Sequence, residues 1–520
     1  MSFFVNSLLL DARQWPDKPA VISGQKTLSY SELDDQSNRL ANALKAIGVG
    51  KNDRIALLLK GCVEWMVAFC ACQKLGAAAA LLHSRLLTDE LTKMMELTKA
   101  SVLIYAQEYA DKAIWIEKKD HNVKRCICVG EPAAKRHMCF AELLKASVPT
   151  APQTEIHGDE ASVILFTSGT TGVSKGIVRT QNMMSIYADV ITDDGWSVKG
   201  EEVMLTPAPL YHAAGLCCVV KMVGLGGTLV LVDSFCPEKI CKQIEKYKAT
   251  QVALVPPRTY QRLEREGHAA NYDLSTVKLA HITANKAGRE CMDDILKIFP
   301  NTALRLTWGS TEAANVTVSI VTRQMLHDNN SLYNTVGKVN NVSSIELIKE
   351  NGETAAEGEI GEAYVKSPLV FGGYLDDPDR TARSLKDGWF RTEDLMYRDA
   401  DGYYYMMGRK RDMIKSGGEN VYAQEIEQVI RSYPMVLDCA VIAVPDEKFD
   451  EAVGAAVVLK QGSALDTKEF LRFCKAYLPS FKKPRYLAVL DKLPENDMGK
   501  VQKNILKRDY MDRFRQICDK

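Results

Sequence analysis

A run of glycine, serine and threonine between a strand-like segment and a lysine is the part of this sequence best suited to bind an anion. The segment VILFTSGTTGVSKG occupies residues 163–176. Glycines let backbone N–H groups approach a phosphate, hydroxyl groups add donors, and Lys175 supplies a positive charge. The spacing is not that of a Walker A loop, and a Ser/Thr-rich surface turn is the alternative. The candidate phosphate-binding residues are Thr167, Ser168, Gly169, Thr170, Thr171, Gly172 and Lys175.

Four further motifs follow this loop along the chain. They read WGSTE at 308–312, GWFRTED at 388–394, GRKRD at 408–412 and LPENDMGK at 493–500. Together with the loop they resemble the signatures of the adenylate-forming superfamily, which contains acyl-CoA synthetases, beetle luciferases and the adenylation domains of peptide synthetases. One such motif is weak evidence, but their joint occurrence in the family's order, over almost the whole chain, is specific.

The resemblance implies an ATP-dependent acid–CoA ligase. Such an enzyme joins a carboxylic acid to AMP, releases pyrophosphate, and then passes the acyl group to a thiol. Two anions meet in the first step, so cations and hydrogen-bond donors are required. By resemblance, Glu312 is the Mg²⁺-binding carboxylate, and Thr311 and Thr167 contact phosphate or nucleotide. Lys500 bridges the acyl carboxylate and the α-phosphate.

The same resemblance implies a nucleotide site and an acyl site. Asp394 is expected to bind the ribose hydroxyls with Arg409 as its partner, the alternative being an ordinary ion pair at a linker. Trp308 and Gly309 belong to the nucleotide-binding motif. His212, in the segment PLYHAAG at 209–215, is expected to gate or orient the acyl group, although a lone histidine is more often structural.

Coenzyme A is the expected thiol. It requires cations, a stacking surface and a narrow channel. The glycine turn at 417–418 resembles the part of acyl-CoA synthetases that lines the pantetheine tunnel. The basic stretch at 481–485 has a solvated turn as its alternative. The candidate CoA-binding residues are Gly417, Gly418, Phe449, Arg85, Lys483 and Arg485.

Both steps must share one site, although pyrophosphate exit and thiol entry need different surroundings. The family solves this by rotating its small domain about one hinge residue, and Arg411 occupies that position here. A hinge needs only a tolerated change of backbone dihedral angle, so the identity of its side chain is not decisive.

Two departures from the family pattern affect the nucleotide pocket. Glu393 stands in place of the usual glycine before Asp394, and residues 283–285 read Thr-Ala-Asn where many relatives have Gly-Gly-Ala. Neither removes a charge that the reaction needs. The chain is therefore predicted to be active, with the shape of its nucleotide pocket altered.

Helical and strand-like patterns alternate along the chain, which predicts parallel β-sheets covered by helices. We expect helices at 30–47, 64–75 and 237–247, and strands at 54–59, 203–205 and 252–255. The composition changes at the GRKRD motif. The predicted fold is therefore α/β, with a large domain at 1–408 and a small mobile α+β domain at 409–520. In the small domain we expect helices at 423–432 and 468–476, and strands at 438–444 and 452–459.

Charge and cysteine content narrow the class of protein. Lys plus Arg and Asp plus Glu both number 66, so nothing favours nucleic acid or an anionic membrane as a partner. Apolar runs are too short to span a bilayer, and the N-terminus lacks the features of a signal peptide. The 14 cysteines lie scattered in apolar segments and are expected to be reduced core thiols. A cytoplasmic enzyme is predicted, with a homodimer left open.

Three other functions share some of these features. An enzyme that loads a carrier-protein thiol is disfavoured in its amino-acid form, because Tyr211-His212-Ala213-Ala214 stands where an aspartate would bind the amine. A luciferase-like oxygenase would share the adenylation residues, and a non-catalytic nucleotide sensor would not need Lys500. The acyl pocket is expected near His212, Thr283 and Trp308, for a small or medium monocarboxylate of aromatic, alicyclic or carnitine-like type.

Overall fold

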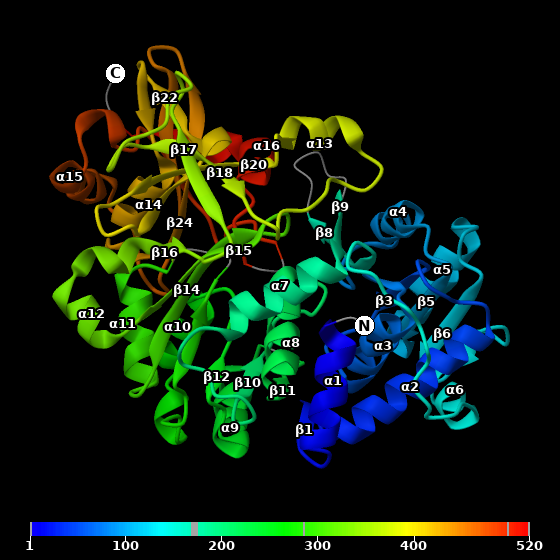
Figure 1. The fold of residues 1–520 in the computed structure, drawn as a ribbon. Coiled ribbons are helices and arrows are strands. Elements are labelled where there is room, and N and C mark those ends of the chain that lie inside the picture. The colour runs from blue at the N-terminus through cyan, green and yellow to red at the C-terminus, as the bar shows by residue number, and fades with distance from the viewer. Residues whose placement is uncertain (1–2, 168–174, 234, 284–286, 497–498, 518–520) are drawn as a thin grey trace.

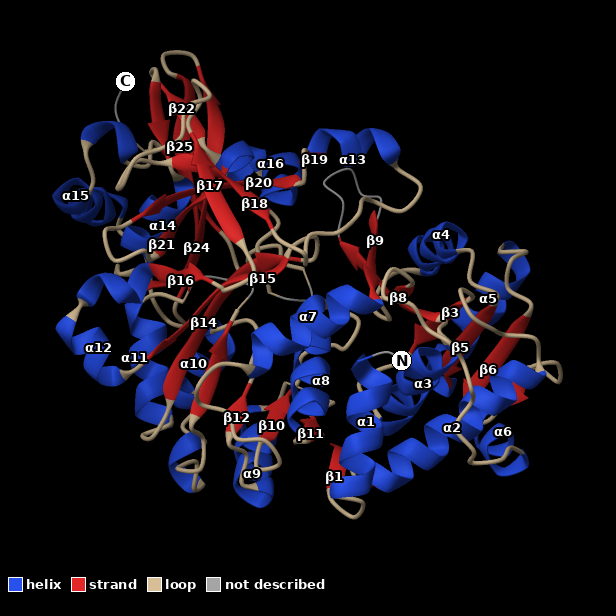
Figure 2. Ribbon diagram, viewed as in Figure 1, coloured by secondary structure: helices blue, strands red, loops and turns tan. Residues whose placement is uncertain are grey.

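The structure is a computed structural model that describes residues 3–167, 175–233, 235–283, 287–496 and 499–517. Within that part of the chain, three β-sheets and their covering helices make up the molecule (Figures 1 and 2). The C-terminal elements gather at one end, beside the strands β17 (Ser344–Ile348) and β18 (Gly361–Lys366) of the large domain (Figure 1).

The first sheet belongs to the N-terminal third and has the strand order β7-β6-β5-β3-β4-β8-β9. Its strands pair in parallel except β8 and β9, which form an antiparallel pair. The predictions at 30–47, 54–59 and 64–75 are confirmed to within a residue. Strands are β3 Arg54–Leu58, β4 Ala78–Leu81, β5 Val102–Ala106, β6 Arg125–Val129, β7 Met138–Cys139, β8 Ala161–Thr167 and β9 Lys175–Thr180, and helices are α2 Tyr30–Ala46, α3 Val63–Leu75, α4 Thr88–Thr98, α5 Ala110–Lys119 and α6 Phe140–Ala146.

The central sheet is mixed, with the order β17-β18-β20-β21-β16-β15-β14-β13-β12-β10-β11-β1-β2 and β19 beside β20. Its strands are β1 Pro19–Ser23, β2 Lys26–Ser29, β10 Val203–Thr206, β11 Thr228–Leu231, β12 Gln251–Val252, β13 Leu279–Ile282, β14 Ala303–Ser310, β15 Ala314–Val321, β16 Thr335–Val339, β17 Ser344–Ile348, β18 Gly361–Lys366, β19 Leu385–Lys386, β20 Trp389–Arg398 and β21 Tyr404–Arg409. Its helices are α1 Phe3–Gln14, α7 Gln181–Thr192, α8 Ala213–Leu225, α9 Pro237–Tyr247, α10 Arg258–Arg265, α11 Arg289–Ile298, α12 Arg323–Asp328 and α13 Pro378–Ser384.

Two sequence expectations are wrong in this sheet. The pairing is parallel from β10 to β14 but antiparallel from β14 to β16. A short hairpin joins β14 to β15, and such a hairpin can join only antiparallel strands. The strand expected at 252–255 ends at Val252, where the chain leaves the sheet ahead of two prolines. Proline lacks the N–H group that a central strand needs.

The small C-terminal sheet has the order β23-β22-β25-β26-β27, with β24 paired to β25. The four elements predicted there are confirmed to within a few residues. The proposed boundary after residue 408 stays a prediction, since β21 extends to Arg409. Strands are β22 Ile414–Ser416, β23 Glu419–Val421, β24 Val436–Asp446, β25 Asp450–Leu459, β26 Tyr486–Val489 and β27 Arg515–Gln516, and helices are α14 Ala423–Arg431, α15 Thr467–Tyr477 and α16 Lys503–Asp509.

Helices cover both faces of the central sheet. Leu304 and Leu306 of β14 pack on one face in a cluster with residues of α9 and α11. Helix α8 covers the other face; it begins after His212 and ends at Gly226, whose φ of 59° suits glycine. The strands therefore carry their loops to one edge of the sheet, between the helices and the small domain.

Two predictions from the sequence, on membrane spans and on cysteines, can be compared with the structure. Of the helices in the described ranges, none is both long enough and apolar enough to cross a membrane. The cysteines of the described residues are all free thiols, and most of them are buried.

Candidate active site

Two paired strand ends flank the segment that is predicted to bind phosphate. Thr167 ends β8 and is paired with Lys175, which begins β9. Residues 168–172, named above as phosphate candidates, lie outside the described residues. The Nζ of Lys175 is 5.0 Å from the ring centre of Tyr374. Desolvation and the charge of Arg380 lower the pKa of Lys175, while Glu312 opposes that shift, so these groups share one region.

Tyr374 connects this lysine to the proposed metal ligand. Its hydroxyl donates a hydrogen bond of 3.0 Å to Oε1 of Glu312. The backbone of Glu312 is held as well, because its carbonyl accepts a 2.8 Å bond from the N–H of Phe371. Sequence reasoning missed Tyr374; the only local signal was the Gly-Gly pair before it. One carboxylate oxygen of Glu312 thus has a fixed donor, and the group suits Mg²⁺, which prefers oxygen ligands.

The turn that presents Glu312 depends on a close approach at Gly309. A Cβ on Gly309 would lie 1.7 Å from the carbonyl oxygen of Ala314, so another side chain would push the hairpin apart. The carbonyl of Thr311 accepts a hydrogen bond of 2.5 Å from the buried guanidinium of Arg179. The turn is therefore rigid where the motif predicts nucleotide contacts.

Asp394 lies at the centre of a buried polar group. Its Oδ2 accepts a 3.0 Å hydrogen bond from Nε1 of Trp308. Its Oδ1 is 2.6 Å from Nε of Arg409, an ion pair that lacks the alignment of a hydrogen bond. Strand pairing places Asp394 opposite Arg409, as β20 and β21 run side by side. Burial raises the pKa of Asp394, and the charges of Arg409 and Lys500 oppose that rise.

The residue before Asp394 has an unusual backbone. Glu393 has a φ of 62°, in the left-handed region that favours glycine. The conformation belongs to a bulge, because residues 392–394 of β20 face the single residue Ala363 of β18. This backbone conformation explains why relatives usually have glycine at this position. Glu393 therefore has a strained backbone here.

Lys500 reaches this group from the C-terminal domain. The residue as a whole is exposed, but its ammonium end lies among charged groups of the site. Desolvation lowers the pKa of Lys500 to about 8; Arg409 adds repulsion and Asp394 opposes the shift. The structure therefore brings the expected catalytic lysine and Asp394 into one site.

His212 lies at the start of α8 within an aromatic cluster. Its ring centre is 5.0 Å from that of His83 and 4.7 Å from that of Tyr211. Burial lowers the pKa of His212 to about 3, and the charges of His83 and Arg85 add to the effect. The imidazole is therefore neutral at physiological pH. His83 was not predicted, and only the fold brings it here.

The expected CoA residues separate into two places. In the small domain, the N–H of Gly417 donates to the carbonyl of Phe449 at 3.1 Å, and the guanidinium of Arg485 lies 4.0 Å from the Phe449 ring centre. Gly418 follows with a φ of 88° and open space around it. Lys483 lies two residues before Arg485. Arg85 is instead in the large domain, beside His212.

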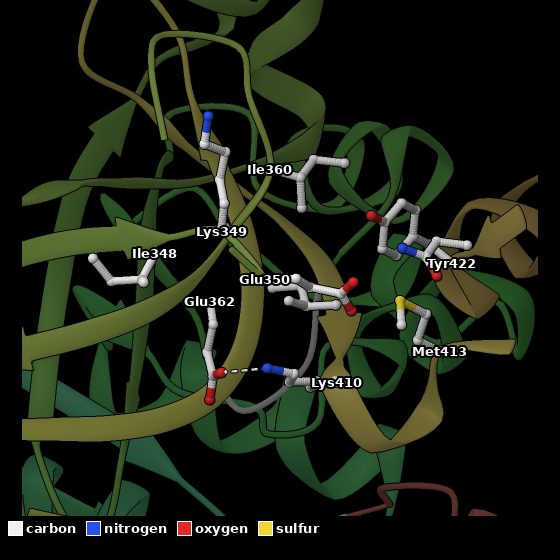
Figure 3. Close-up of a pocket in the computed structure, with 11 residues that line it drawn as sticks. Ile348, Lys349, Glu350, Ile360, Glu362, Lys410, Met413 and Tyr422 are labelled. Atoms are coloured by element: carbon white, nitrogen blue, oxygen red, sulfur yellow. Dashed lines mark hydrogen bonds and ion pairs between the residues drawn. The ribbon is translucent and has the colours of Figure 1, made fainter. Parts of the chain in front are cut away.

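A small pocket lies where the two domains meet (Figure 3). There Nζ of Lys410 donates a 2.9 Å hydrogen bond to Glu362, which Arg391 also contacts. Burial raises the pKa of Glu362, but the bonds from Arg391 and Lys410 outweigh burial and hold it below its usual range. The chain is thus anchored immediately before Arg411, which is itself exposed. The lining residues are Ile348, Lys349, Glu350, Ile360, Gly361, Glu362, Leu395, Lys410, Met413, Asn420 and Tyr422.

A second cluster of metal-ligand types lies in the N-terminal sheet. Glu117, Cys126 and His137 lie within 4.8 Å of one another. The nitrogens of His137 already contact Glu117 at 3.0 Å and the hydroxyl of Tyr105 at 2.7 Å. Burial also raises the pKa of Cys126 to about 12, which disfavours the thiolate that a metal would need. These residues form a satisfied polar network.

We compared the chain with known protein families, related proteins and solved structures. Residues 10–375 match the family model described as AMP-binding enzyme, and residues 425–500 match the AMP-binding enzyme C-terminal domain. The chain is 32% identical over 505 residues to a feruloyl-CoA synthase from an Amycolatopsis species, covering 96% of this chain and 97% of that protein. It is 31% identical to a crotonobetaine/carnitine–CoA ligase of Shigella dysenteriae, over 92% of this chain and 93% of the relative. The crystal structure of ATP-bound MatB from Rhodopseudomonas palustris superposes with a TM-score of 0.87 at 27% identity, over 98% of this chain and 99% of that one.

Proposed function

This chain belongs to the AMP-binding enzyme family, and we propose that it is an ATP-dependent acid–CoA ligase of the AMP-forming type. Two observations support this proposal: Lys175 and Glu312 are neighbours in the large domain, and Asp394 of the large domain is a neighbour of Lys500 of the small domain. Cations, a carboxylate and a ribose acceptor in one site are what acyl adenylate formation requires.

In the first step, we assign separate parts of the nucleotide to separate residues. Asp394, held by Trp308 and Arg409, accepts hydrogen bonds from the ribose hydroxyls. Thr167 and Lys175 lie at the ends of the phosphate loop, and Lys500 bridges the acyl carboxylate and the α-phosphate. Glu312, oriented by Tyr374, would hold Mg²⁺, which neutralises phosphate charge when bound.

His212 orients the acyl group next to this centre. Because its pKa is lowered to about 3, the imidazole is uncharged and does not compete with Lys500 for the attacking carboxylate. Its Nε2 has no hydrogen-bond partner among the described residues, so the ring retains an atom that can meet a substrate.

The second step uses the small domain in another orientation. The stacked pair of Phe449 and Arg485, next to the Gly417 turn, suits the adenine and phosphate of CoA. We place Lys483 and Arg85 at the CoA phosphates, and Gly418 along the pantetheine arm. Rotation at Arg411 would bring the CoA residues to the adenylate, with Lys410 still anchored to Glu362.

Two other products of an acyl adenylate remain alternatives. A carrier-protein thiol would use the same first step, and a luciferase-like oxygenase would need no CoA site. The cluster of Gly417, Phe449 and Arg485 favours CoA over both. We further propose a cytoplasmic location, supported by the free thiols of the described cysteines. The homodimer stays a prediction.

The test is a pyrophosphate-release screen with ATP, Mg²⁺, CoA and a panel of carboxylic acids. Acid-dependent release of pyrophosphate together with AMP and acyl-CoA is the expected result. Release without acyl-CoA would point to a different acceptor. A panel in which no acid exceeds the acid-free rate would overturn the ligase assignment.

A further inference from the structure

One buried arginine of the large domain has donors without partners among the described residues. Arg305 of β14 is 1% exposed, and its Nε and Nη2 have no hydrogen-bond partner in the part of the chain that the structure describes. Buried guanidinium groups are nearly always paired, because unmet charged donors cost free energy. The equally buried Arg179 shows the usual case, since it donates to the carbonyls of Leu369 and Thr311.

Two buried or half-buried acidic residues of this domain, Asp194 and Glu202, are bound to other groups. Asp194 pairs with the buried Lys221 at 2.5 Å. Glu202 accepts a hydrogen bond from Thr250 and a 2.8 Å bond from Gln251. Within the described residues, neither carboxylate forms an ion pair with Arg305. Nε and Nη2 of Arg305 therefore have donors that the described residues leave without a partner.

The direction of Arg305 follows from its strand. Side chains of β14 alternate between the two faces of the sheet. Leu304 and Leu306 pack in the cluster with α9 and α11. Arg305 therefore lies on the opposite face, which α7 and α8 cover (Figure 1). The arginine and the nucleotide motif belong to the same strand.

Contacts connect Arg305 to the reaction centre along this face. Burial and the neighbouring Cys217 of α8 raise the pKa of Tyr187 of α7, and the charge of Arg305 opposes that rise. Nδ2 of Asn315 lies 3.9 Å from Sγ of Cys217. Asn315 is in turn paired with Gly309 across the β14–β15 hairpin. These contacts form a chain of neighbouring side chains from Arg305 to the strand end at Gly309, where the nucleotide motif lies.

We propose that the acid activated by this enzyme carries a second anionic group, a carboxylate in the first place, and that Arg305 binds this group at the inner end of the acyl site. The inference rests on the proposed function and specifies its substrate class. A carboxylate matches the fork of donors that a guanidinium presents. Aliphatic and aromatic dicarboxylic acids both belong to this class. This replaces the monocarboxylate expected from sequence, and a carnitine-like cation is disfavoured by the charge of Arg305.

The experiment compares acids of matched length in the pyrophosphate-release assay. Adipate is compared with its monomethyl ester and with hexanoate, terephthalate with benzoate, and carnitine serves as the cationic acid. Wild-type enzyme should use the better diacid with a kcat/KM at least about tenfold above its uncharged match, because a site built for a polar group rejects analogues that lack it. Carnitine should be the poorest acid of the panel.

Substitutions of Arg305 test whether this residue causes the preference for diacids. Arg305→Met should raise the KM for the diacid by about tenfold or more and leave the matched monoacid within about threefold. Arg305→Lys keeps the charge and should retain part of the preference. Arg262→Met, at a surface arginine of the same domain, should change neither acid.

Each outcome decides the inference. Monoacids used as well as every diacid by the wild-type enzyme would overturn the inference and leave the ligase assignment standing, even if Arg305→Met does not fold. Equal loss of diacid and monoacid turnover in Arg305→Met would also overturn it, because that pattern indicates a structural role. No turnover of any acid would contradict the proposed function itself.

Discussion

The indole Nε1 of Trp308 donates a 3.0 Å hydrogen bond to Oδ2 of Asp394, and this bond joins residues that are 86 positions apart in the chain. Trp308 belongs to the turn that presents Glu312, whereas Asp394 belongs to the strand that leads toward the hinge. One bond therefore holds the proposed metal ligand and the proposed ribose acceptor in a fixed relation.

Trp308→Phe tests the importance of this bond. Removing the donor leaves a buried carboxylate with one partner fewer, which should cost about 1.5–3 kcal/mol of stability. The KM for ATP should rise by about tenfold if the ribose contact depends on the bond. Thermal unfolding and pyrophosphate release measure the two effects. Trp196→Phe, at an exposed tryptophan, should leave both unchanged.

Lys500→Ala separates the two half-reactions. The variant should lose adenylate formation by about a hundredfold or more, since a positioned charge at the reacting groups is removed. Thioester formation from supplied acyl-AMP and CoA should be largely spared. Stopped assays of each half-reaction measure this, with Lys492→Ala as the exposed control. Equal loss of both steps would refute the division of labour.

The lowered pKa of Lys500 predicts a pH dependence. Since the charged form serves the first step, adenylate formation should fall as pH rises through about 8. Lys500→Arg, which stays charged, should move this limb to higher pH at the cost of rate. The unfolded lysine titrates near 10.5, so between about 8 and 10.5 the unfolded state binds more protons, and this residue's contribution to stability rises with pH. A pH profile of pyrophosphate release that is identical in wild type and Lys500→Arg would contradict this assignment.

Glu393→Gly should stabilise the protein. A side chain in the left-handed region costs about 1 kcal/mol, which glycine avoids at φ near 62°. The melting temperature should rise by about 2 °C. Glu393→Ala keeps the Cβ and removes the same carboxylate, so it should give no such gain. If alanine stabilises as much as glycine, the effect belongs to charge and not to the backbone.

Gly418→Leu should block the thiol step. A side chain here should obstruct the pantetheine arm and leave ATP–pyrophosphate exchange within about threefold of wild type. Gly462 is a matched control, because it also has a positive φ and open space in the same domain. Gly462→Leu therefore carries similar backbone strain and should spare both steps. Loss of exchange in Gly418→Leu alone would indicate a nucleotide or folding defect.

Much of the site could be predicted because its chemistry is encoded in short motifs. Lys175, Glu312, Asp394 and Lys500 each lie in a segment whose residue types and spacing suit phosphate, metal or ribose. Helices such as Pro237–Tyr247 were equally predictable, because their apolar period is local. The antiparallel part of the central sheet could not be predicted, because strand direction depends on how distant segments pair.

The sequence by itself therefore determined the family, the two-step chemistry and the residue types that serve it. Only the tertiary structure decided which of the described side chains form hydrogen bonds or ion pairs and which do not. The sequence did not predict a role for Tyr374, whereas the fold places it between Lys175 and Glu312. Arg305 lies between two leucines of an ordinary strand, and only the fold shows that its Nε and Nη2 have no partner among the described residues. The physical reason is that hydrogen-bond partnership and burial are set by residues far apart in the chain, which no local pattern records.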